Sequence, residues 1–175
     1  MSLARFFLPR CILFAAFSLF CFSAFALPSQ DIRPVNNRDY FPAALDLIGK
    51  ASRDIRIILY LAQRQTKYPD SPVNRLLEAL VGAGKRGVDV QVILENPEGR
   101  FASSRDLAVK NTDVARFLSQ KGVKVWEDSP SITTHAKVLV VDGRYTVIGS
   151  TNWTYSALAK NNEAAVIIDS PEVAR

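Results

Sequence analysis

One short stretch, THAKVLVVDGRYTVIGSTN at residues 134–152, gathers side chains that could act on a substrate together. His135 is the only histidine in the chain. Side chains alternate between the two faces of a strand, so His135 and Lys137 share one face, and Ser150 and Asn152 also share one. The four residues offer an imidazole nucleophile or base, a cation, a hydroxyl and an amide. That set suits a phosphodiester, whose charge needs donors and whose phosphorus needs an attacking group.

An Asp-Gly pair in the middle of this stretch predicts a hairpin turn. Asp142 and Gly143 separate two apolar runs, 137–141 and 145–148, and this dipeptide favours tight hairpin turns. The return strand would bring the end of the stretch back beside its start, and Gly149 would allow another backbone to approach closely. The alternative is that these are ordinary turn and strand-end residues. For Asp142 that interpretation is favoured, because the turn itself calls for Asp.

The rest of the chain alternates between helical and extended patterns. Apolar residues recur at helical spacing over 41–51, from Pro72 to about Gly87, and again through Val114 up to Gly122, after a polar stretch at 100–110. This alternation predicts an α/β fold, with a mixed β-sheet flanked by helices on both faces. Strands are expected at residues 54–61, 88–94, 123–126, 137–141, 145–148 and 163–169.

The first 26 residues have the layout of a secretory signal peptide. Arg5 and Arg10 precede an apolar run, and Ala24-Phe25-Ala26 has the form of a cleavage site. We therefore expect an exported protein, periplasmic or secreted, with a single catalytic domain over 27–175. The alternative is an uncleaved membrane anchor at residues 11–26, because the run is only slightly shorter than a bilayer span.

The cysteines and the net charge limit the possible partners. Cys11 and Cys21 both lie in the leader, so no disulfide, thiol nucleophile or thiolate metal site is expected in 27–175. A single histidine makes a zinc site improbable as well. The net charge of +5 suits an anionic partner such as nucleic acid or phospholipid headgroups, but it does not choose between them.

The end of the sequence has the pattern of a helix start. Ser170-Pro171-Glu172 supplies a capping residue, a proline and an acid, and three residues follow. Three residues are too few to complete a stable helix. Either the chain ends in a frayed turn or a C-terminal helix is truncated.

The spacing of the fixed residues resembles the HKD signature of the phospholipase D superfamily. The pattern is His135-x-Lys137-x4-Asp142-x6-Gly149-Ser150-x-Asn152, with Glu163 at the place of the family's downstream acid. The resemblance extends to size and strand order across 27–175. It implies the sandwich fold of phospholipase D-like nucleases and hydrolysis of phosphodiester bonds.

Residue roles follow from this resemblance. His135 would be the nucleophile that forms a phosphohistidine intermediate, and Lys137, Ser150 and Asn152 would bind the phosphate oxygens. Glu163 would hydrogen-bond the imidazole and fix its tautomer. Asp142 and Gly149 would be structural members of the motif, and no metal or other cofactor is implied.

The resemblance also implies a homodimer. The mechanism uses two histidines, one to attack and one to protonate the leaving oxygen, and single-motif family members pair two chains about a twofold axis. His135 of each subunit would thus complete one shared site.

The sequence is compatible with three functions. The short exported chain resembles the bacterial endonucleases that cleave DNA and RNA without metal and with little sequence preference. Basic residues that could follow a nucleic-acid backbone occur between the second strand and the third helix, at Arg100, Arg105, Lys110 and Arg116. The alternatives are a phospholipase D acting on phosphatidylcholine or cardiolipin, and an inactive nucleic-acid-binding dimer.

Overall fold

The fold centres on one seven-stranded mixed sheet. The computed structural model describes residues 26–96 and 104–175, so residues 1–25 of the predicted signal peptide lie outside the described residues. The strand order is β1-β7-β6-β5-β2-β3-β4. β2 and β3, and β3 and β4, pair in parallel, and the other neighbours pair antiparallel. The strands are β1 (Asp31–Pro34), β2 (Asp54–Leu59), β3 (Asp89–Leu94), β4 (Lys124–Glu127), β5 (Lys137–Val141), β6 (Tyr145–Gly149) and β7 (Ala165–Asp169).

Four α-helices and one short 3-10 helix accompany this sheet. They are η1 (Asn37–Asp39), α1 (Tyr40–Lys50), α2 (Pro72–Lys85), α3 (Ser104–Gln120) and α4 (Tyr155–Ala159). Local sequence explains several of the boundaries. The Ser71 hydroxyl accepts a hydrogen bond from the Asn74 N–H and Pro72 follows it, which is a favoured helix start. The Thr154 hydroxyl caps α4 in the same way, by accepting from the Ala157 N–H.

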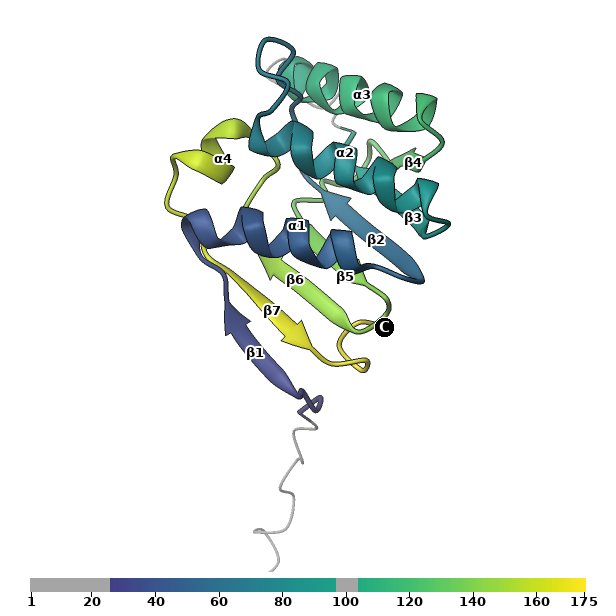
Figure 1. The fold of residues 1–175 in the computed structure, drawn as a ribbon. Helices are drawn as coiled ribbons and strands as arrows, with labels where there is room; N and C mark the ends of the chain where they lie inside the picture. Colours follow the sequence, from purple (N-terminus) through teal and green to yellow (C-terminus); the bar gives the residue numbers. More distant parts are fainter. Residues whose placement is uncertain (1–25, 97–103) are drawn as a thin grey trace, which may run out of the picture.

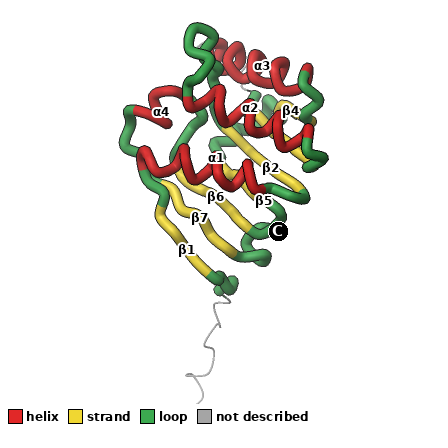
Figure 2. Tube along the Cα trace, in the orientation of Figure 1, coloured by secondary structure: helices red, strands yellow, loops and turns green. Residues whose placement is uncertain are grey.

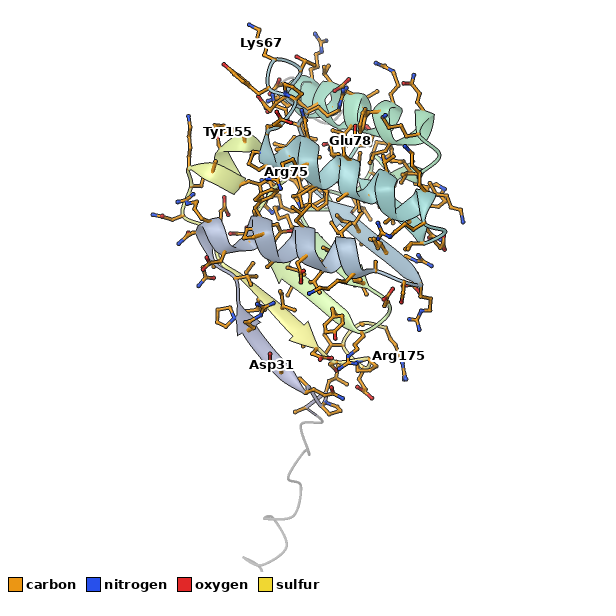
Figure 3. The ribbon with its side chains drawn as sticks, viewed as in Figure 1. Asp31, Lys67, Arg75, Glu78, Tyr155 and Arg175 are labelled. Carbon is orange, nitrogen blue, oxygen red and sulfur yellow. The ribbon has the colours of Figure 1, made fainter. Side chains whose placement is uncertain are left out.

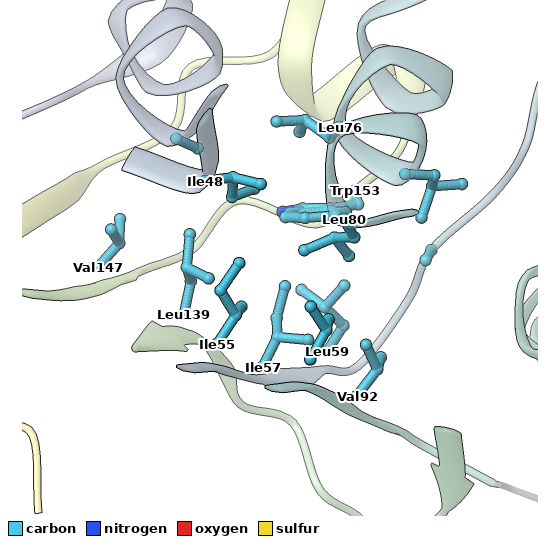
Figure 4. Close-up of a cluster of buried hydrophobic side chains, with 14 of the residues drawn as sticks. Ile48, Ile55, Ile57, Leu59, Leu76, Leu80, Val92, Leu139, Val147 and Trp153 are labelled. Atoms are coloured by element: carbon cyan, nitrogen blue, oxygen red, sulfur yellow. The ribbon is translucent and has the colours of Figure 1, made fainter. Parts of the chain in front are cut away.

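The helices pack on one face of the sheet (Figures 1 and 2). Right-handed crossovers that advance in one direction, from β2 through α2 to β3 and from β3 through α3 to β4, place both helices on the same side. Ile57, Val92 and Leu139 of the sheet are buried beneath them. Figure 4 shows these strand residues facing Leu76 and Leu80 of α2, with the Trp153 indole between the layers.

The opposite face carries a row of apolar residues in register across six strands. Trp126 and Ile148 are 49% and 45% exposed, and the side chains between them are partly exposed. Within residues 26–96 and 104–175, no helix covers this face. The row comprises Trp126, Ile93, Ile58, Val138, Ile148 and Val166.

The predicted α/β class with a mixed sheet is confirmed, but the expectation of helices on both faces is wrong for the described residues, in which the helices cover one face and the other stays exposed. Some boundaries also differ from the sequence patterns. β1 and α4 have no counterpart among the expected elements, because four or five residues carry too little periodicity. α3 begins at Ser104, inside the stretch that is polar in the sequence. The residues after Ser170 form a turn, in which the Ala174 N–H donates to the Ser170 carbonyl at 3.1 Å.

Candidate active site

The predicted catalytic and phosphate-binding residues lie at one end of the sheet, where β2 and β6 end and β5 and β7 begin. His135 lies two residues before the start of β5, Ser150 follows β6, and Glu163 lies just before β7. Leu59 pairs with Lys137, and Gly149 pairs with Ala165. The hairpin thus returns the end of the motif to its start, as the Asp-Gly turn predicts.

Lys137 is buried at this end although it is charged. Lys137 is 7% exposed, and its Nζ donates a hydrogen bond to the His135 carbonyl oxygen at 2.7 Å. The ammonium also lies 4.8 Å from the centroid of the Tyr60 ring. Burial lowers the pKa of Lys137, and the charge of Glu163 partly offsets that effect. A desolvated cation with one carbonyl partner is well prepared to bind an anionic group.

His135 is exposed, and its ring packs against Tyr60. The two ring centroids are 4.3 Å apart and the planes are tilted by 59°. The backbone on either side is held: the Thr134 N–H donates to Glu95 Oε2 at 2.7 Å, and the Ala136 carbonyl accepts from the Tyr60 N–H at 2.9 Å. The imidazole is therefore open to solvent on a fixed backbone.

Glu163 contacts Ser150 and Asn161. The Ser150 hydroxyl donates to one carboxylate oxygen, and Asn161 Nδ2 donates to the other at 3.1 Å. The Glu163 N–H donates to Asn37 Oδ1 at 2.7 Å. No hydrogen bond joins Glu163 to the imidazole of His135 in the part of the chain that the structure describes, so the role implied by the family resemblance stays a prediction.

Asn152 has unused hydrogen-bonding capacity. Its Oδ1 is buried without a hydrogen-bond partner in the described part of the chain. The next residue fixes its position: Trp153 is fully buried, its N–H donates to the Leu61 carbonyl at 3.0 Å, and its Nε1 donates to the Tyr40 hydroxyl at 3.1 Å. Because Oδ1 is an acceptor, only the Nδ2 group of this amide could donate to a phosphate oxygen.

Gly149 occupies a place that no side chain fits. A Cβ at this position would lie 2.3 Å from the Ala164 carbonyl oxygen and 2.5 Å from the Ala165 Cβ. The close approach lets the Ser150 N–H donate to that same carbonyl at 2.9 Å. Gly149 therefore sets the path of the backbone that carries Ser150.

Asp142 lies at the far end of the hairpin from His135. The two are seven positions apart along an extended chain, or roughly 23 Å at the usual strand rise. Asp142 has a φ of 54°, and its carboxylate accepts from the backbone N–H groups of Ser52, Arg53 and Asp54. Burial alone would raise the pKa of Asp142, but these donors outweigh it and the pKa is lowered. The contacts of Asp142 are with the start of β2.

Three residues that the sequence patterns did not single out support the site. Tyr60 contacts His135 and Lys137, and Glu95 anchors Thr134. Asn111 is 1% exposed; its Oδ1 accepts from the Ala62 N–H at 2.9 Å, and its Nδ2 donates to the carbonyls of Tyr60 and Glu95 at 2.9 and 2.8 Å. A polar residue at a buried helix position is the one sequence signal that could have found Asn111.

Three of the four basic residues that could follow a nucleic-acid backbone lie within the described part of the chain. Arg100 lies outside the described residues, Arg105 and Arg116 are exposed on α3, and Lys110 forms an ion pair with Asp106. In residues 26–96 and 104–175, no three histidine, cysteine or acidic side chains gather as a metal site would require. Across the same ranges no helix is long and apolar enough to span a bilayer.

A buried lysine, an exposed imidazole, a hydroxyl and an amide lie together at the end of the mixed sheet of this α/β domain, and such groups are suited to bind and attack a phosphate ester. Comparison with known proteins gives the family. The model of the family described as "Cardiolipin synthase, PLD-like domain" matches residues 44–175, and the chain belongs to this phospholipase D superfamily.

The chain covers a different share of each relative. The chain is 26% identical over 129 residues to a mitochondrial cardiolipin hydrolase of Chlamydomonas reinhardtii, a match of 74% of this chain and 50% of that protein. It thus spans about half the length of this curated relative. Nuc from Salmonella typhimurium, a phospholipase D family member, is 27% identical with a TM-score of 0.65, over 82% of this chain and 86% of Nuc. NucT from Helicobacter pylori, at 17% identity and a TM-score of 0.60, shares the fold over 82% of this chain and 89% of NucT.

Proposed function

We propose that this chain is a phosphodiesterase that cleaves nucleic acid as a metal-independent endonuclease. The observation that carries the proposal is the meeting of His135, Lys137 and Ser150 at one sheet end, with an open imidazole and a buried cation. The similarity to Nuc, at 27% identity over 86% of that chain, supports the proposal.

The proposed reaction proceeds in two displacements. An imidazole nitrogen of His135 attacks phosphorus, the bond to the leaving oxygen breaks, and a second imidazole donates its proton to that oxygen. The same second imidazole then takes a proton from water, whose oxygen attacks the phosphohistidine and releases His135. Lys137 and Asn152 bind the non-bridging oxygens, whose charge grows as each bond forms.

We propose that the second imidazole comes from another copy of the chain. His135 is the only histidine in the sequence, and it is exposed where another subunit could reach it. We therefore propose a C2 homodimer in which two His135 side chains share one site. The composition of residues 1–26 supports export as the setting of this activity.

Phospholipid hydrolysis is the second candidate. The name of the matching family and the similarity to a cardiolipin hydrolase favour it. The two candidates share the same site chemistry and differ in the surface around it.

One assay tests the proposal and separates the candidates. The purified full chain is incubated in chelator with plasmid DNA, with RNA and with cardiolipin vesicles, beside the His135→Asn variant. We expect cleavage of nucleic acid that survives chelator and falls at least about a thousand-fold in the variant. Cleavage that requires a divalent metal, or that persists without His135, would overturn the mechanism. Turnover of vesicles alone would assign the lipid activity.

A further inference from the structure

A hollow between the β2–α2 segment and α4 is lined by aromatic and basic side chains. Its volume is about 730 Å³, in the range of small-molecule sites. One wall comes from the segment between β2 and α2 and the other from α4. Figure 3 shows Lys67 on the first segment and Tyr155 on α4 along the same edge of the molecule. The lining side chains used below are Gln65, Lys67, Tyr68, Asp70, Tyr155 and Lys160.

Two tyrosines in this hollow are unusually exposed for large aromatic residues. Tyr68 is 67% exposed and Tyr155 is 41% exposed. The Lys160 ammonium lies 5.3 Å from the centroid of the Tyr155 ring. Exposed rings accompanied by cations are the usual elements of a surface on which unpaired bases stack.

Both walls are held in place. The Asn74 side chain donates to the carbonyls of Gln65 and Tyr68 at 2.9 and 3.1 Å and accepts from the Gln65 N–H at 3.1 Å, which fixes the turn that carries Tyr68. On the other side, Arg38 donates to the Asn161 and Lys160 carbonyls at 2.8 and 3.3 Å. A preformed site loses less entropy on binding than a mobile one.

The lining favours a base and its phosphate over an acyl chain. An acyl chain would need an aliphatic channel, whereas the only lining residues without a polar side chain are two prolines. The lining holds two lysines and one carboxylate, that of Asp70, so its net positive charge suits an anionic polymer.

The walls of the hollow are joined to the segment that carries Asn152. Tyr155 follows Asn152 by three residues, so their Cα atoms are at most about 11 Å apart. On the opposite wall, the Gln63 N–H donates to the Trp153 carbonyl at 2.9 Å, two residues before Gln65. A strand held by its phosphate at Lys137 and Asn152 can therefore place a neighbouring base here.

We propose that Tyr68 and Tyr155 form a stacking subsite for an unpaired nucleobase next to the cleaved phosphodiester. This inference rests on the proposed nuclease function. Lys67 and Lys160 would bind the flanking phosphates. A base in a duplex is already stacked and paired, so the subsite favours single-stranded substrate.

The test compares the full chain with Tyr68→Ala, Tyr155→Ala and the double variant on a single-stranded oligonucleotide. Each substitution should raise KM by about 5- to 100-fold, with the loss in KM rather than kcat. Tyr68→Phe and Tyr155→Phe keep the rings and should restore KM. Trp126→Ala removes an exposed ring on the opposite face of the sheet and serves as the matched control.

A second measurement needs no variant. An oligonucleotide with abasic positions beside the cleavage site should bind the unmodified chain as weakly as the intact oligonucleotide binds the double variant. Unchanged KM in the double variant, equal losses on duplex and single strand, or a loss seen only on phospholipid vesicles would each overturn the subsite. Failure of the unmodified chain to hydrolyse DNA, RNA and methyl p-nitrophenyl phosphate would instead refute the proposed function.

Discussion

The pKa of Lys137 depends on the groups that surround its side chain. Burial favours its neutral form, while the nearby Glu163 carboxylate favours the ammonium. In the proposed mechanism the charged form binds phosphate, so activity should fall as pH rises through the pKa of Lys137.

Glu163→Gln should move the alkaline limit of the rate profile to lower pH. Removing the carboxylate removes the effect that raises the pKa of Lys137, so the ammonium is lost earlier as pH increases. The measurement is kcat/KM against pH for both proteins, with Glu78→Gln on α2 as a control that should leave the limit in place. An unchanged limit in Glu163→Gln would contradict the electrostatic link.

Asp142 affects the stability of the fold. Its pKa is lowered in the folded state from a reference value of 3.8. A carboxyl group with a depressed folded pKa stabilises the fold above its unfolded pKa, and that contribution is lost as pH falls through the folded value.

Asp142→Asn should therefore cost about 1–3 kcal/mol of unfolding free energy at neutral pH, and the difference from the parent should shrink below about pH 4. Asn is the suitable replacement because it tolerates the positive φ of this turn. Denaturant unfolding at several pH values measures the effect. Asp46→Asn, which breaks only an exposed pair with Lys50, should cost less than about 0.5 kcal/mol.

At the scale of elements, the contact between β6 and β7 determines where the site residues lie. Gly149 and Ala165 pair directly, and the strands leave no room for a Cβ. The path of these two strands positions Ser150 and Glu163 on either side of the junction.

Gly149→Ala should destabilise the protein by about 1–3 kcal/mol or more through overpacking and should also reduce activity by shifting Ser150. Gly84→Ala, in α2, meets nothing within 4 Å and should be neutral or slightly stabilising. Thermal unfolding and the nuclease assay measure both effects. Parent-like stability and activity in Gly149→Ala would show that the junction can relax.

Local sequence patterns predict part of the fold and of the site, but not the contacts between distant segments. Strong local patterns, such as Pro72 at a helix start and Asp142-Gly143 in a turn, predict their elements and the hairpin. They cannot show that Asn111 binds the ends of β2 and β3, or that Tyr60 lies against His135, because these contacts join distant segments. They also give no sign of α4, which is too short for periodicity and yet carries Tyr155.

This sequence has one histidine, so the proposed two-histidine mechanism requires two subunits. If two subunits share one site, chains that lack His135 should inactivate the partners with which they assemble. Mass measurement in solution should show a dimer.

Mixing provides the sharper test. When equal amounts of parent and His135→Asn chains are allowed to exchange subunits, about a quarter of the dimers keep both histidines, and activity should fall to about that fraction. Independent sites in each chain would leave about half. A monomer with full activity would refute the shared site.

The carboxylate of Asp142 also bears on the order of folding. It binds Ser52 across 90 positions of the chain, and β2 pairs with β5 over a similar separation. Contacts this distant form late, because a long loop must close first. During synthesis, β2 and β3 can emerge well before the segments that carry His135 and Glu163. We therefore expect the nascent chain to be partly folded and catalytically inactive until its last strands pair with the sheet.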